Sequence, residues 1–105
     1  MLLVNTDGVP GKEIKEVLGL VRGSTIQSKH IGKDLLAGLK TIVGGEINEY
    51  TEMLENARQI ALGRMVKDAE SKGGNAIVNI RFATSAIMQG AAELMVYGTA
   101  VIIED

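Results

Sequence analysis

The stretch EINEYTEMLENARQIALGRMVKDAESK, residues 46–72, decides the fold because it has the features of one long helix. Its acidic side chains come mainly first and its basic ones mainly last, which suits the helix dipole. Gly73 and Gly74 follow directly and tolerate the left-handed conformation that ends many helices. The apolar residues spread around well over half of the circumference at about 100° per residue, whereas one core needs a narrower stripe. We therefore expect a second partner for this helix, and an acidic partner for Arg58, which lies inside the apolar arc.

Two strands are expected after the helix. Residues 76–83 alternate between apolar and polar side chains, which predicts a half-buried strand with Asn79 and Arg81 on its polar face. Residues 93–103 are apolar on both faces, which is typical of a strand that is covered on both sides. Residues 89–90, Gln-Gly, supply the turn between them. We expect another subunit to provide one of the two covers.

The part of the chain before the long helix is less uniform. Residues 2–4 form a short strand candidate, and residues 32–43 carry apolar side chains at the three- and four-residue spacing of a second, shorter helix. Residues 13–27 are ambiguous. Apolar residues at 14, 17, 18 and 21 have helical spacing, but glycines at 19 and 23 and a β-prone continuation oppose a helix. Periodicity alone does not decide between helix and strand here.

Composition favours one small domain that assembles with other copies. The chain has 105 residues, of which 46% are hydrophobic. Its mean hydropathy of +0.16 is high for a small monomer, because small domains have the most surface to keep wet. The apolar residues beyond what one small core needs lie on the wide arc of the 46–72 helix and on both faces of the 93–103 strand. We expect subunit contacts to bury them.

The composition, the net charge and the length of the apolar stretches exclude several classes of function. With no Cys, the chain has no disulfide framework, thiolate metal cluster or thiol redox pair. A net charge of −2 argues against a nucleic-acid partner. The richest apolar stretch, residues 94–103, is too short to span a bilayer, and the N-terminus lacks a signal-peptide pattern. We therefore expect a cytoplasmic protein with neither a nucleic-acid nor a membrane partner.

Runs of residues in order along the whole chain carry a family resemblance: EVLGLVRG at 16–23, HIGKD at 30–34, IVGGE at 42–46, YTEML at 50–54, GNAI at 74–77, MQGAAE at 88–93 and YGTAV at 97–101. They resemble the YbjQ-like family, a small bacterial and archaeal family labelled "putative heavy-metal-binding". The resemblance implies a single domain over residues 1–105 and a strand at residues 13–27. It also implies a dodecin-like α+β subunit, with a curled antiparallel sheet packed on one long and one shorter helix, that assembles into a homopentamer. The family's function is not established.

Three residues are candidate metal ligands: His30, Glu46 and Glu49. His30 is the single histidine, and imidazole is a common metal ligand and general base. The competing interpretation is a helix-entry residue bonded to backbone or to Asp34, which we favour because one His without Cys cannot build a soft-metal site in one subunit. A symmetric ring could still bring several copies together on its axis. Glu46 and Glu49 could share a divalent cation, although solvated charges at a helix N-terminus are the commoner outcome.

Asn79 and Arg81 are the candidate residues for binding a small molecule, because they could line a groove or channel on the polar face of their strand. The alternative is a solvated sheet face. No nucleophile motif accompanies the single His, so we expect a binding protein rather than an enzyme. We expect a homo-oligomer that holds a divalent metal ion or small ligand at its subunit junctions, the alternative being a structural or protein-interaction ring without a small ligand.

Overall fold

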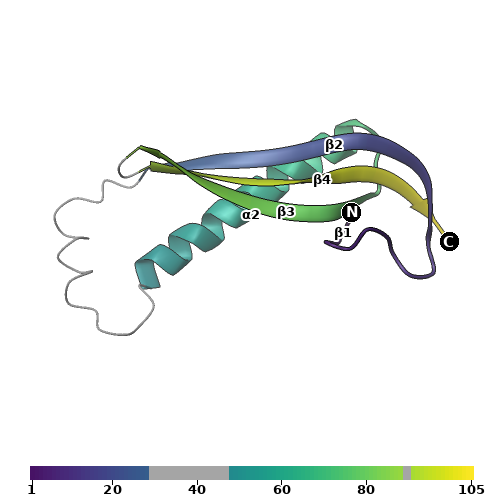
Figure 1. The fold of residues 1–105 in the computed structure, drawn as a ribbon, viewed down its shortest axis with the longest axis horizontal. Helices are drawn as coiled ribbons and strands as arrows, with labels where there is room; N and C mark the ends of the chain where they lie inside the picture. The colour runs from purple at the N-terminus through teal and green to yellow at the C-terminus, as the bar shows by residue number, and fades with distance from the viewer. Residues whose placement is uncertain (29–47, 89–90) are drawn as a thin grey trace.

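The computed structural model describes residues 1–28, 48–88 and 91–105. These residues form an α+β arrangement of one long helix and a long, curved sheet (Figure 1). The elements are β1 (Leu2–Leu3), β2 (Glu13–Ser28), α2 (Asn48–Ser71), β3 (Ala76–Met88) and β4 (Ala91–Glu104). The long helix and the two strands after it are confirmed. The expected shorter helix at 32–43 and the turn at 89–90 lie outside the described residues.

The sheet is mixed, with strand order β1-β3-β4-β2. β4 pairs with β3 on one side and with β2 on the other, both antiparallel, but β1 pairs with β3 in parallel. The expectation of a wholly antiparallel sheet is therefore wrong at β1. The N-terminal segment runs alongside β3 and prolongs the ladder, with Val4 N donating to Ile77 O at 3.0 Å. A parallel partner is possible because a long connection, which includes β2 and α2, joins β1 to β3.

Residues 13–27 form a strand, as the family resemblance implies, and their helical spacing does not produce a helix. The alternation of β2 explains this outcome. Val21, Gly23 and Thr25 are buried, whereas the residues between them are exposed or half-buried. Because a period of two places one face of the strand against α2, tertiary packing outweighs the apolar spacing at the start of the segment.

The main core lies between α2 and one face of the sheet. α2 contributes a stripe of side chains four residues apart, Ala57, Ala61, Met65 and Ala69, and all four are 0% exposed. Residues at this spacing lie on one side of a helix. Three of the four are alanines, so the helix axis can approach β2 closely. The helix ends at Ser71, and Gly73 just beyond it has a φ of 85°, the left-handed conformation expected from the sequence.

A second, smaller core covers the opposite face at one end of the sheet. Ala76 and Val78 of β3 and Val101 and Ile103 of β4 are buried there. Half-buried side chains of the N-terminal part, Val4, Val9 and Ile14, pack against them. This end of β4 is therefore covered on both faces by its own chain. The expectation that another subunit must supply the second cover is not needed at this end.

The outer edge of β2 receives two polar side chains from α2. The backbone N–H of Arg22 donates to Asp68 Oδ2 at 3.4 Å, and Arg64 Nη1 donates to the Ser24 carbonyl at 2.6 Å. Lys72 Nζ lies 2.6 Å from Asp68 Oδ1. Charged side chains that occupy an exposed edge are a common protection against unwanted strand pairing. α2 therefore both packs on β2 and satisfies part of its free edge.

Asp68→Asn should make the protein less stable at pH 7 and should have no such effect in acid. The hydrogen bond from Lys72 is the main cause that holds the pKa of Asp68 below its ordinary value of 3.8. A lowered folded-state pKa contributes stability above the unfolded value, and that stability is lost as the pH falls through the folded value. Since the side chain is one-third exposed, we expect a loss of about 0.5 kcal/mol.

Urea unfolding at pH 7 and at a pH well below 3.8 measures this difference. Glu70→Gln is the matched control. Glu70 is exposed on the same helix, and this substitution removes the same charge from a side chain for which no bond to the described part of β2 is found. A loss that is equal at both pH values, or equal in the two variants, would contradict the role assigned to the Asp68 carboxylate.

Candidate functional site

The structure places Asn79 and Arg81 on β3, at the edge that faces the N-terminal segment. His30 and Glu46 lie outside the described residues, and Glu49 is in the first turn of α2. The predicted metal ligands therefore stay a prediction. Within residues 1–28, 48–88 and 91–105, no group of three or more His, Asp or Glu residues is placed to hold a metal ion. The predicted pairing of Arg58 is confirmed, since Nη1 lies 3.4 Å from Glu55 Oε1 on the same helix.

A β-bulge at Asn79 shapes this part of β3. Val78 pairs with Thr99 and Arg81 with Tyr97, so β3 carries one more residue than β4 between these pairs. Asn79 has a φ of 56°, a left-handed conformation that Asn tolerates better than most residues. The bulge changes the alternation: Val78 packs in the second core, whereas Ile80 packs against the core under α2. The single apolar face predicted for residues 78, 80 and 82 is therefore divided.

Asn79→Val should lower the free energy of unfolding by about 1–2 kcal/mol, because a β-branched side chain is strained in the left-handed region. Asn79→Gly should stay within a few tenths of a kcal/mol, since glycine adopts this conformation without a steric penalty. Urea unfolding of both variants tests the bulge. Equal stability of the two variants would show that the left-handed conformation is not required at this position.

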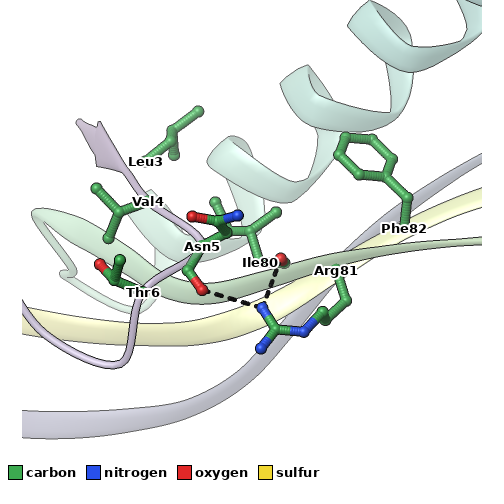
Figure 2. A pocket seen from close by; sticks show the side chains of 7 residues that line it. All are labelled: Leu3, Val4, Asn5, Thr6, Ile80, Arg81 and Phe82. Carbon is green, nitrogen blue, oxygen red and sulfur yellow. Dashed lines mark hydrogen bonds between the residues drawn. The ribbon is translucent and has the colours of Figure 1, made fainter.

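A pocket opens where the N-terminal segment passes the bulge (Figure 2). Its volume is about 670 Å³, within the range of small-molecule sites. Its lining comes from two segments that are far apart in the sequence: Leu3, Val4, Asn5 and Thr6 from the N-terminal segment, and Ile80, Arg81 and Phe82 from β3. We call this the edge pocket. Sequence reasoning found Arg81 but missed the N-terminal half, which contains no motif.

Among the described residues that line the edge pocket, Arg81 is the single charged one. Its Nη1 donates to the carbonyls of Asn5 and Ile80, both at 3.0 Å, which anchors the N-terminal segment to β3 (Figure 2). The side chain is exposed. Among the residues that the structure describes, no carboxylate forms an ion pair with it. The guanidinium therefore holds a fixed position and keeps its positive charge available at the opening.

Apolar side chains are also left exposed away from the pocket. On β2, Val17, Leu20 and Ile26 are 65%, 67% and 62% exposed. On β3, Ile87 and Met88 are 47% and 67% exposed. Exposed apolar side chains in such number are typical of surfaces that contact another protein. Within the described part of the chain, no helix is long and apolar enough to cross a membrane.

Comparisons with known proteins relate the whole chain to one family. The sequence model of a family described as "Putative heavy-metal-binding" matches residues 1–104. A UPF0145 protein from Clostridium novyi is 65% identical over 103 residues, which cover 98% of this chain and 99% of that protein. UPF0145 proteins from Clostridioides difficile and Methanosarcina acetivorans are 60% and 57% identical, and cover 100% and 98% of this chain and 94% and 97% of their own lengths.

A solved structure supports the fold. The crystal structure of a protein of unknown function from Pediococcus pentosaceus, assigned to a DUF74 family, matches with a TM-score of 0.62. The match covers 99% of this chain and 98% of that chain at 17% sequence identity. At this identity the likeness concerns the fold alone.

Proposed function

The chain belongs to the YbjQ-like family described as "Putative heavy-metal-binding", and on that premise we propose that it is a homo-oligomeric binding protein that holds a small ligand or metal ion where subunits meet. The observation that carries this proposal is the edge pocket, which opens beside the part of β3 that has no outer partner among the described residues. An unpaired strand edge is a ready surface for a second chain. A ligand in the pocket would then lie at a subunit junction.

The exposed apolar residues support the assembly part of the proposal. Small domains gain stability by burying such side chains, each of which contributes about 1.5–3 kcal/mol when fully buried. Leu20 and Ile26 lie on the face of β2 that α2 does not cover. A contact with another copy would remove both from water. The dodecin-like arrangement and the homopentamer that the resemblance implies belong to this proposal.

Light scattering coupled to size exclusion tests the assembly. A pentamer should elute with five times the 11.2 kDa mass of the chain. Leu20→Glu should lower that mass, because a carboxylate cannot be buried in an apolar contact without a partner. Lys15→Glu adds a carboxylate at an exposed polar position of the same strand and should leave the mass unchanged. A monomer at micromolar concentration in the unsubstituted protein would overturn the proposal.

The family description favours a metal ion as one candidate ligand, and His30, Glu46 and Glu49 are the residues that would hold it. Elemental analysis after purification without chelators is the direct measurement. We expect bound metal to fall in His30→Ala and in Glu49→Gln, with Glu52→Gln on the same helix as the control. Substoichiometric metal that these substitutions do not change would remove the metal ion from the proposal and leave a small molecule.

The competing function is a structural or interaction ring without a small ligand. The exposed apolar residues of β2 are compatible with it, because such a ring needs only subunit contacts. The two functions differ at the edge pocket. A ring of this kind predicts an assembly of the same mass whose edge pocket binds no small molecule.

A further inference from the structure

We propose that the edge pocket binds an organic carboxylate with an apolar body, and that Arg81 contacts the carboxylate group. This inference rests on the proposed binding function and names the chemical class of its ligand. It starts from the composition of the lining. Four of the seven lining residues are apolar, two are neutral and polar, and one is a cation.

The charge of the lining selects an anion over a metal cation. A site for a divalent ion needs several carboxylate, imidazole or thiolate ligands, and none of the seven lining residues carries one. The guanidinium of Arg81 also repels a cation at this position. The same guanidinium suits a carboxylate, because its planar array of N–H donors can form two parallel charge-assisted bonds.

The local hydrogen bonds leave Arg81 able to form such bonds. Its Nη1 bonds to the carbonyls of Asn5 and Ile80, which fixes the plane of the guanidinium. A guanidinium has five N–H donors in all. For the remaining ones, no acceptor is found among residues 1–28, 48–88 and 91–105. A ligand that binds a held side chain loses less conformational entropy than one that must first order it.

The apolar side chains explain why the ligand needs more than a charge. Figure 2 shows the Arg81 guanidinium on one side of β3 and the side chains of Leu3 and Phe82 on the other. Leu3 is 37% exposed and Phe82 is 48% exposed. Covering apolar surface stabilises a complex in proportion to the area that is removed from water. An aliphatic or aromatic body attached to the carboxylate would extend past the edge of β3 to cover part of this apolar surface, which an inorganic anion would not do.

The bulge accounts for the position of the pocket. The ladder between the N-terminal segment and β3 extends to bonds from Asn79 N to Thr6 O and from Ile80 N to Val4 O. The extra residue at Asn79 then places Ile80 and Arg81 beside this segment while Phe82 continues along the open edge. Bulges of this kind often redirect side chains next to binding sites.

Octanoate and octanamide are the probes, because they share one chain length and differ in charge. Binding is followed by carbon–proton NMR of the methyl groups of Leu3, Val4 and Ile80 in the full-length assembled protein. We expect octanoate to shift these signals with an affinity at least about tenfold above that of octanamide. Added salt should weaken octanoate binding and leave octanamide binding unchanged, since an exposed ion contact is screened.

Arg81→Gln should remove the difference between the two probes, and Arg58→Gln, which removes an exposed arginine on α2, should keep it. Because Arg81→Gln also loses the bonds to Asn5 and Ile80, Phe82→Ser provides a second variant. It keeps the guanidinium and should weaken both probes together. Equal affinity of octanoate and octanamide for the unsubstituted protein would overturn the proposal, as would an unchanged preference in Arg81→Gln.

The same samples separate this inference from the proposed function. If neither probe shifts the methyl signals while light scattering still gives an assembly, the carboxylate class is wrong and the assembly stands. Methyl signals that change only on dilution to dissociated subunits would show that a neighbouring copy fills the pocket, which also overturns the inference. A monomer that still prefers octanoate would instead keep the edge pocket and remove the subunit junction.

Discussion

Gly23→Ala should lower the free energy of unfolding by about 3 kcal/mol or more, the upper end of what overpacking costs. Gly23 lies on β2 where α2 crosses it. A Cβ at this position would collide with the carbonyl oxygen of Ala61 and lie 2.5 Å from the backbone nitrogen of Met65. Both atoms belong to the helix backbone, which cannot move aside alone. The whole helix would have to shift away from the sheet.

Gly63→Ala is the matched control for this prediction. Gly63 lies on α2, and no atom of the described part of the chain is found within 4 Å of a Cβ added there. In an exposed helix interior, Ala is favoured over Gly by about 0.5–1 kcal/mol, so this variant should be more stable. Urea unfolding gives both values. A Gly23→Ala protein as stable as the parent would mean that α2 does not approach β2 as closely as the structure has it.

The close contact at Gly23 also shows which part of the fold could be predicted from sequence. α2 follows from local rules, because its apolar spacing and the stop at Gly73 act within a few residues. The expected charge order holds only in part, since the last turn of α2 carries no basic side chain. β2 does not, since its early residues have helical spacing and only the contact with α2 makes the glycine at 23 informative. The family resemblance supplied the strand that periodicity could not.

Non-local pairing explains the other differences. β1 has two residues, and its parallel partner Ala76–Ile77 lies more than 70 positions away, so nothing local indicates the direction of pairing. The bulge at Asn79 interrupts an alternation that is regular in the sequence. One signal for it was present: Asn is unfavourable in strands but tolerates the left-handed conformation.

Only the β3 half of the edge pocket could be predicted from the sequence, because non-local pairing brings the other half to it. Arg81 was found because it shares the polar face of an alternating strand with Asn79. The segment from Leu3 to Thr6 was not found, since its side chains acquire their role only when the N-terminal segment lies against β3. Of the predicted metal residues, His30 and Glu46 lie outside the described residues, and Glu49 is not among the seven residues that line the edge pocket. Substitutions at these positions and at Arg81 therefore test metal binding and carboxylate binding separately.

Gly98→Val should also destabilise the protein by about 3 kcal/mol, because the strand that carries it is the centre of the sheet. Gly98 of β4 pairs with Val21 of β2 and lies opposite the bulge of β3. A Cβ there would lie 2.7 Å from Ile77 Cγ2, 3.0 Å from the Val78 carbonyl oxygen and 3.2 Å from Ile80 Cγ1. The two further methyl groups of Val increase this crowding, since Ile77 is fully buried.

The same substitution should weaken octanoate binding in protein that is still folded, because displacing Ile80 alters a side chain that lines the edge pocket. Thr99→Val is the control: it introduces the same side chain one residue later, where the position is half-buried on the opposite face. Its stability should change by less than about 0.5 kcal/mol. If Gly98→Val lost stability but bound octanoate with unchanged affinity, the bulge and the pocket would be mechanically independent, and Arg81 with the N-terminal segment would suffice to form the site.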